Sequence, residues 1–425
     1  MLLLYPVAKH YITPQAVPIA LLLFATSTSL VRYSNQVKQY SSDMFLGLLL
    51  LLMSTQVVKQ DLAIRWLIIY AIVGAIAIWF SFPVVFVLAG AGAVLGFQSL
   101  AKREWGKAVQ LSIVGFIWLG SFVVLYLTSP VSELVSNQGI VAQISAGSGF
   151  IPLPPLSFSD ARWYLTTLFD LFDVPARLTL TGIAALAFLM GCVAIWKTNK
   201  YSLLMLLAPL LVTMLVSGAQ LYPSSDRWVL FLVPLVLLFV AEGGMFIVAK
   251  TKHTYPAIGI ALVALLLLHS IASEAFRLVV PRGSEEVRPA LKYITARRSA
   301  GDQLYVYHGS RKAFLYYAER LRLDDDDYII GVSGIDQEIN RKDLDNFVAD
   351  LDKLRGNDRV WFLFSNVHET GLGPKQTSGA DEELFILYYL DNIGTRLAYF
   401  RNQNAAVYLY DLSGSSTASI PSIAP

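Results

Sequence analysis

Long apolar runs separated by short polar turns occupy the first two thirds of this 425-residue chain. A membrane-spanning helix needs about 17–25 mostly apolar residues. Nine windows of roughly that length can be drawn, at 14–32, 39–56, 65–81, 83–101, 108–128, 178–196, 202–220, 228–248 and 256–276. Residues 1–8 look like the tail of a tenth, partial helix, and the sequence Ser81-Phe82-Pro83 divides the pair at 65–101. The pattern predicts a polytopic α-helical membrane protein with about nine full spans plus a partial one.

The pattern changes after residue 281, where short alternating and apolar runs predict strands between amphipathic helices. Strands are expected at 303–307, 328–331, 359–364 and 405–410, and helices at 313–320, 343–354 and 382–392. Strands that alternate with helices favour a three-layer α/β fold. We therefore predict a transmembrane domain over 1–281, a soluble α/β domain over 282–412 and a disordered tail over 413–425, which is small and polar.

Composition supports this division. The chain is 55% hydrophobic and 15% charged, whereas a soluble domain is roughly 25% charged. Residues 1–281 hold only ten of the 31 acidic side chains. The net charge of +2 gives no reason to expect a nucleic-acid partner, and the single cysteine, Cys192, excludes an intrachain disulfide.

Basic residues gather in alternate loops between the predicted spans. These are Lys9, His10, Lys59, Arg65, Lys102, Arg103, Lys107, Lys197, Lys200, Lys250, Lys252 and His253. By the positive-inside rule these loops are cytoplasmic. The polar turn at 32–43, the loop at 129–177, the loop at 222–228 and the C-terminal domain would then lie outside the cytoplasm, in a protein of the inner or plasma membrane.

The polar segment 33–43 is unusually rich in hydrogen-bonding side chains for a turn between two apolar runs. It carries two tyrosines, a lysine, amides and an aspartate close to the bilayer surface. Two cations, Lys38 and Arg227, sit in short polar turns on the predicted outer side. Cationic side chains there can hold a phosphate, arginine as a bidentate fork and lysine as a point charge.

Two segments carry a resemblance to a known family. The run Ser-Leu-Val-Arg-Tyr-Ser-Asn-Gln-Val-Lys-Gln-Tyr-Ser-Ser-Asp at 29–43, followed by an apolar helix, resembles a segment of the GT-C glycosyltransferases. Residues 221–234, which include Pro223, Arg227 and Pro234, resemble a later segment of the same enzymes. The nearest kin are the family 39 and protein-mannosyltransferase-like bacterial enzymes. The resemblance covers roughly 1–275 and is weaker over 282–425.

The resemblance implies a hexosyl or pentosyl transferase that takes a sugar from a polyprenyl-phosphate carrier. The acceptor would be a glycan, lipid or protein of the cell envelope, with membrane lipid around the site. Lys38 and Arg227 would meet the phosphate, and Tyr33, Gln36 and Tyr40 would line the sugar or carrier site. Asp43 either joins that site or merely favours the start of the following helix. No metal ligands are assigned, and the resemblance leaves open whether a divalent metal takes part.

Two departures from the family stand out. The family commonly has glutamate where Gln36 stands. Its catalytic acid lies in a first outer loop that the given sequence lacks, so we expect either an internal start at Met1 or a truncated copy, and the catalytic base is unknown. Two alternatives from other classes remain, a non-catalytic scaffold and a lipid-carrier flippase or transporter of an envelope-polysaccharide system.

Three further features carry weaker hypotheses. The amphipathic run at 160–172, which contains Trp163 and Phe172, is either a lid over the site or a structural support. The aspartates at 324–327 favour a solvated acidic turn over a calcium site, because the ligand spacing of such loops is absent. Glu242 lies well inside a predicted span, where packing or snorkelling competes with function.

Overall fold

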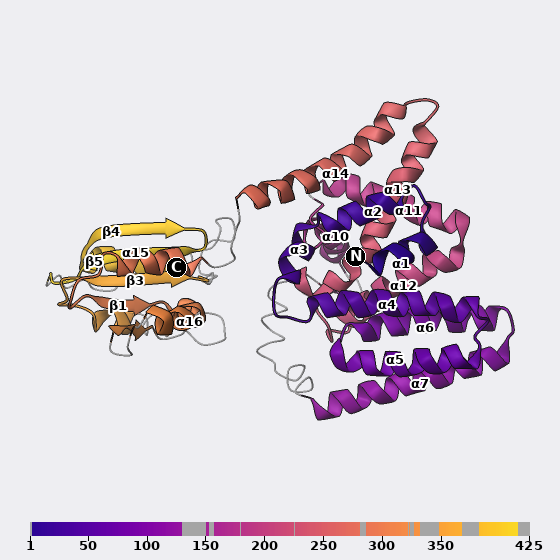
Figure 1. Ribbon diagram of the computed structural model, residues 1–425, viewed down its shortest axis with the longest axis horizontal. Helices are drawn as coiled ribbons and strands as arrows, with labels where there is room; N and C mark the ends of the chain where they lie inside the picture. The colour runs from indigo at the N-terminus through magenta and orange to yellow at the C-terminus, as the bar shows by residue number, and fades with distance from the viewer. Residues whose placement is uncertain are drawn as a thin grey trace. The chain divides into compact units, whose positions relative to one another are not determined.

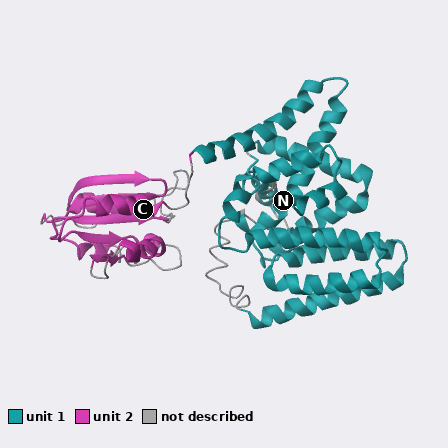
Figure 2. Ribbon diagram, in the orientation of Figure 1, with its two compact units in different colours: residues 1–279 teal, residues 280–425 magenta. Residues whose placement is uncertain are grey.

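The computed structural model describes residues 2–129, 150–152, 157–178, 180–224, 226–280, 286–321, 323, 327–331, 348–367 and 382–414. The chain divides into two compact units, Met1–Val279 and Val280–Pro425 (Figure 2). Each unit is described by itself. Much of the predicted loop at 129–177 and most of the predicted tail at 413–425 lie outside the described residues.

The first unit is a bundle of α-helices (Figure 1). Its elements are α1 (Leu4–Tyr11), α2 (Val17–Ala25), α3 (Thr28–Ser34), α4 (Tyr40–Lys59), α5 (Ile64–Phe80), α6 (Val84–Ala101), α7 (Trp105–Thr128), α10 (Phe158–Asp173), α11 (Thr181–Thr198), α12 (Lys200–Gly218), the 3-10 helix η1 (Asp226–Leu232), α13 (Val233–Thr251) and α14 (Pro256–Val279). The helices follow the apolar windows of the sequence, because in hydrocarbon only a helix or closed barrel satisfies every backbone group.

Seven described helices are long and apolar enough to cross a membrane, or eight if α2 and α3 form one bent span. The polytopic helical membrane protein predicted from the sequence is therefore confirmed. The described residues fall short of the nine full spans expected, partly because α5 has only 17 residues. The difficult pair at 65–101 is two helices, since α5 ends at Phe80 and α6 begins at Val84.

The first predicted span, 14–32, is not one straight helix. It breaks between α2 and α3 with a bend of 55°. Two hydroxyl side chains flank the break. Thr26 Oγ1 donates to the Leu22 carbonyl of its own helix at 2.8 Å, and Thr28 Oγ1 donates to Glu274 Oε1 of α14. Such side chains compete with the helical ladder and bend it, an effect that hydropathy alone does not reveal. The expected helix tail at 1–8 is the separate eight-residue helix α1.

Glycines let the central helices approach closely. A Cβ added at Gly243 would lie 1.7 Å from the Ala187 carbonyl oxygen, and one at Gly191 would lie 2.0 Å from the Phe239 carbonyl oxygen. The backbones of α11 and α13 are therefore in direct contact, as is common where small residues line membrane helix interfaces. In α5, Gly74 leaves room for the Trp118 indole, whose Nε1 donates to the Ala71 carbonyl at 3.2 Å.

Contacts between side chains separate two ends of the bundle. At one end, which we call the 33–43 end, the rings of Phe82, Phe122 and Tyr222 meet near the start of α4. At the other, the 59–65 end, Lys107 Nζ lies 2.5 Å from Asp61 Oδ1. Successive helices from α4 to α7 therefore run in alternate directions, as the predicted loop alternation requires.

The second unit is an α/β domain with a five-stranded sheet in the order β2-β1-β3-β5-β4. Its elements are α15 (Val287–Thr295), β1 (Gln303–Val306), η2 (His308–Ser310), α16 (Arg311–Leu321), β2 (Ile329–Ile330), β3 (Val360–Ser365), α18 (Glu382–Ile393), β4 (Thr395–Asn402) and β5 (Ala405–Asp411). β1 pairs in parallel with β2 and β3, and β5 is antiparallel to both β3 and β4.

Two cores cover the two faces of this sheet, so the predicted three-layer arrangement is confirmed. α15 and α16 cover the face that includes Trp361 and Leu363, and α18 covers the face that includes Phe362 and Phe364. The sequence prediction missed α15 and β4. Buried Asp302 supports the edge of this core, since it accepts hydrogen bonds from Arg359 Nε at 2.8 Å and Trp361 Nε1 at 2.7 Å.

Candidate functional site

The segment 33–43 joins α3 to α4, which begins one residue after the predicted start of its span at 39. α3 ends at Ser34 and α4 already begins at Tyr40, so Tyr40 and Asp43 belong to the helix rather than to the turn. The Tyr33 and Tyr40 rings meet edge to face with centroids 4.9 Å apart. This contact closes the turn and leaves Lys38 exposed at its tip.

The segment that contains Arg227 lies against the start of α4. The 3-10 helix η1 contacts α4, and just before it the Tyr222 hydroxyl donates to the Trp228 carbonyl at 2.8 Å. The Arg227 guanidinium lies 5.9 Å from the centroid of the Trp228 ring, and Arg227 is exposed. Within the described part of the chain, neither Lys38 nor Arg227 forms an ion pair.

Asp43 lies between these two segments and is buried, with 6% of its surface exposed. Its Oδ1 atom has no hydrogen-bond partner among the described residues. Ser81, at the end of α5, lies close to the Asp43 carboxylate, but its geometry falls short of a hydrogen bond and its Oγ is also buried without a described partner. Asp43 lies in the first turn of α4, where a carboxylate favours the helix N-terminus, although no side-chain hydrogen bond caps this helix start. Both alternatives for Asp43 therefore stay predictions.

Tyr222 is the third polar group of this cluster. Burial, the nearby Asp43 carboxylate and the Tyr40 phenol together raise the pKa of Tyr222 far above its ordinary value. Tyr222 therefore stays a neutral phenol, able to donate a hydrogen bond but not to act as a base. We call Asp43, Ser81 and Tyr222 the Asp43 cluster.

Aromatic rings connect the Asp43 cluster to the membrane-facing side of the bundle. The Tyr222 ring stacks on Phe82 with centroids 5.8 Å apart and meets Phe86 at 4.8 Å. Phe82 in turn meets Phe122 of α7 at 5.9 Å. These contacts form a continuous line of rings from the buried carboxylate to the edge of an apolar groove.

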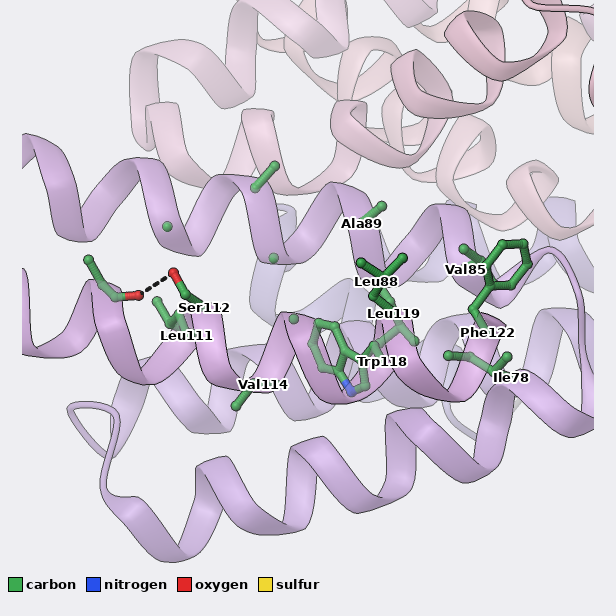
Figure 3. A pocket seen from close by; sticks show the side chains of 15 residues that line it. Ile78, Val85, Leu88, Ala89, Leu111, Ser112, Val114, Trp118, Leu119 and Phe122 are labelled. Carbon is green, nitrogen blue, oxygen red and sulfur yellow. Dashed lines mark hydrogen bonds between the residues drawn. The ribbon is translucent and has the colours of Figure 1, made fainter. Parts of the chain in front are cut away.

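The groove lies between α6 and α7 and has a volume of about 350 Å³. Phe122, Val85 and Ile78 lie at one end of it, and Leu111 and Ser112 lie toward the other (Figure 3). On α6 its floor consists of small residues on one helix face, Ala89, Gly92, Ala93 and Gly96. From Ala108 to Phe122 it follows α7 for about 21 Å, at 1.5 Å per residue.

The hydroxyl of Ser112 and the indole N–H of Trp118, which line the groove, are already hydrogen-bonded within the protein. The Ser112 hydroxyl donates to the Ala108 carbonyl of its own helix at 2.9 Å (Figure 3). The Trp118 Nε1 is occupied by the Ala71 carbonyl. A saturated or isoprenoid hydrocarbon chain is therefore the chemistry that fits the lining.

The structure thus brings together only some of the predicted substrate- and carrier-binding residues. Tyr33, Tyr40 and Asp43 lie in one neighbourhood with the segment that carries Arg227, and Gln36 is half-buried in the turn. The prediction that Lys38 and Arg227 bracket one phosphate stays a prediction.

The sequence interpretation missed Ser81 and Tyr222, and it expected an apolar groove for the carrier tail without identifying the helices that form it. Ser81 was noted only as part of a helix break, and Tyr222 only within the second segment. The alternating small residues of 89–96 were a usable signal, because a face of glycine and alanine on a membrane helix predicts either close helix packing or an open surface.

The predicted amphipathic helix at 160–172 is α10. It begins with a capping box between Ser157 and Asp160, and Phe172 is fully buried against Phe188 of α11, with ring centroids 5.7 Å apart. These contacts support the structural alternative, whereas the lid alternative stays a prediction.

The remaining candidates have local partners. Glu242 Oε2 accepts hydrogen bonds from Thr13 N at 2.8 Å and Thr13 Oγ1 at 2.9 Å. Asp327 pairs with Arg298 at 3.0 Å, while Asp324, Asp325 and Asp326 lie outside the described residues. In the described ranges, no group of three or more His, Cys, Asp or Glu is placed to hold a metal ion.

The fold defines a class, a polytopic helical membrane protein with a C-terminal α/β domain. No protein-family model matches the chain, and no curated protein matches it.

Proposed function

We propose that this chain is a GT-C-type glycosyltransferase of the inner or plasma membrane. It would move a sugar from a polyprenyl-phosphate carrier to an envelope acceptor at the outer face. The observation that carries the proposal is the apolar groove of α6 and α7, which ends at the rings beside the Asp43 cluster. A lipid carrier needs this combination of a long apolar site and a polar site at one end.

The groove is suited to the carrier tail. Its length of about 21 Å along α7 covers much of the roughly 30 Å hydrocarbon core. Its lining is apolar, and α7 is mostly exposed at the side of the bundle. A tail can therefore enter sideways from the bilayer, and no charged side chain needs to be desolvated.

The head of the carrier would lie at the 33–43 end. The cations Lys38 and Arg227 are exposed and form no ion pair among the described residues, so their charge is available to a phosphate. Arg227 lies on η1, which contacts α4, and Tyr33 and Tyr40 close the turn that carries Lys38. In the transfer step these cations would stabilise the charge that grows on the leaving phosphate.

Arg227→Ala tests this role. Loss of one such donor typically lowers the rate by roughly 10²–10³, so the variant should lose sugar transfer from polyprenyl-phosphate hexoses and pentoses at unchanged protein level. Arg162→Ala, an exposed arginine on α10, is the matched control and should cost much less. Equal transfer by Arg227→Ala and the unmutated chain would refute the phosphate role and favour the scaffold alternative.

The orientation has its own test. A reporter that is active only outside the cytoplasm should give signal when fused after Pro425 and none when fused at Lys200. The reverse pattern would overturn both the topology and the outer-face location of the site.

A further inference from the structure

The Asp43 carboxylate is the least satisfied acidic group in the described part of the bundle. Asp43 is 6% exposed and Ser81 is 3% exposed, and both Asp43 Oδ1 and Ser81 Oγ lack a described hydrogen-bond partner. A buried polar atom without a partner costs about 1–3 kcal/mol, and more when it is charged. A fold keeps such a group when a ligand supplies the missing hydrogen bond.

Among the described residues, the other buried acids have hydrogen-bond partners. Glu242, 4% exposed, accepts two hydrogen bonds from Thr13. Asp302, also 4% exposed, is held by Arg359 and Trp361. The unpaired oxygen at Asp43 therefore marks a place for an external donor.

The surroundings of Asp43 limit what that donor can be. Ser81 adds a hydroxyl group beside the carboxylate, and the rings of Tyr222, Phe82 and Phe86 lie alongside. A few convergent polar groups among aromatic faces suit a neutral, hydroxyl-bearing ligand such as a sugar or an alcohol.

We propose that Asp43 is the general base for the acceptor hydroxyl and that Ser81 positions that hydroxyl. This inference rests on the proposed function. It departs from the family that the sequence resembles, which places its acid in a first outer loop, because it uses a carboxylate on α4 inside the bundle.

The acceptor O–H bond breaks and its proton passes to Asp43 Oδ1. The acceptor oxygen forms a bond to the anomeric carbon of the donor sugar. The bond from that carbon to the phosphate oxygen breaks, and its electron pair leaves with the polyprenyl phosphate. Asp43 then returns its proton to water.

The test uses the full chain in lipid nanodiscs. Its two readouts are binding of polyprenyl phosphate alone and transfer from a panel of polyprenyl-phosphate-linked hexoses and pentoses. A general base contributes roughly 10²–10⁴ in rate, so Asp43→Asn should lower kcat by that factor and leave carrier binding unchanged. Asp43→Glu should recover part of the rate. Ser81→Ala should raise the acceptor KM about tenfold, the equivalent of one hydrogen bond of about 1.4 kcal/mol.

Asp61→Asn is the matched control, because this exposed carboxylate lies at the 59–65 end and pairs with Lys107; it should change neither readout. Transfer by Asp43→Asn at the unmutated rate, with Arg227→Ala still impaired, would overturn the base assignment alone. Failure of the unmutated chain to bind polyprenyl phosphate or to transfer from any donor would overturn the proposed function.

Discussion

The two ends of the helical bundle differ in how their carboxylates are placed and paired. At the 59–65 end, Lys107 pairs with Asp61 at 2.5 Å and with Glu104 at 3.3 Å, so cation and carboxylates neutralise one another. At the 33–43 end, Lys38 and Arg227 form no ion pair among the described residues, and the Asp43 carboxylate is buried with an oxygen unpaired. The carboxylates of the 59–65 end thus have a cationic partner and the Asp43 carboxylate has none, while described cations without an ion pair, such as Lys59 and Arg65, occur at the 59–65 end as well. The difference between the two ends therefore lies in the buried carboxylate.

Among variants that keep Asp43 and the two cations in place, filling the groove should give the largest effect. A Cβ at Gly96 meets nothing within 4 Å, so Gly96→Phe should fold and fill the floor. If the new ring excludes about three methylene groups of the carrier tail from the groove, the binding free energy weakens by about 2.4 kcal/mol, which is roughly 50-fold in affinity. We expect that loss for a long-tailed carrier and none for a short-chain analogue, measured by direct binding.

Gly120→Phe is the control for the groove, since Gly120 is on α7, is exposed, does not line the groove and also meets nothing within 4 Å. An equal loss of carrier affinity in both variants would show that the groove is not the tail site.

Replacing the two buried acids of the bundle should separate function from stability. Glu242→Ala leaves two donors of Thr13 without an acceptor and should lower the free energy of unfolding by about 1–3 kcal/mol. Asp43→Asn removes a poorly satisfied charge and should leave thermal stability unchanged or higher. Thermal unfolding of the detergent-solubilised chain measures both, and a larger loss at Asp43 would mean that its carboxylate has a structural role.

The C-terminal domain adds to this comparison a buried carboxylate, Asp302, that accepts hydrogen bonds from its neighbours. Burial alone would raise the pKa of Asp302, but hydrogen bonds from Arg359, Ser299 and Trp361 outweigh it and hold the pKa below its ordinary value of 3.8. A carboxyl group whose pKa is lower in the folded chain than in the unfolded chain stabilises the fold at pH values above the unfolded pKa. This contribution is lost as the pH falls through the folded pKa.

Asp302→Asn should therefore reduce hydrogen-exchange protection of β1 and β3 at neutral pH. It should also weaken the further loss of protection that the unmutated chain shows below pH 3.8. An unchanged acid response would mean that other carboxylates control the acid sensitivity of this domain.

Lys107→Ala should have the smallest effect. Surface ion pairs contribute about 0–1 kcal/mol, and Lys107 lies at the end of the bundle away from the Asp43 cluster. Transfer activity should persist at matched expression, in contrast to Arg227→Ala. Loss of transfer in Lys107→Ala would show that the two ends do not differ in function.

Hydropathy predicted most of the fold because helices of a membrane bundle are apolar throughout. It missed the bend between α2 and α3, where the hydroxyl groups of Thr26 and Thr28 form hydrogen bonds. It also missed β4, an edge strand whose apolar run is only Leu397-Ala398-Tyr399-Phe400 and is flanked by Arg396 and Arg401.

The candidate site was predictable only where its residues are close in sequence. Tyr33, Tyr40 and Asp43 belong to one segment and were found. Ser81 and Tyr222 join them through folding of α5 and of the turn after α12, which no local pattern encodes. The groove needs the pairing of α6 with α7 and is likewise a tertiary property.

The backbone contact between α11 and α13 also has an evolutionary consequence. At Gly191 and Gly243 even a methyl group would overlap a carbonyl of the facing helix, so selection should hold both positions as glycine in any homologue that keeps this packing. The exposed side chains of α7, such as Phe116 and Leu127, meet no such limit, and they can drift among apolar residues. Sequence divergence should therefore accumulate at exposed positions of α7 that do not line the groove and spare the centre of the bundle.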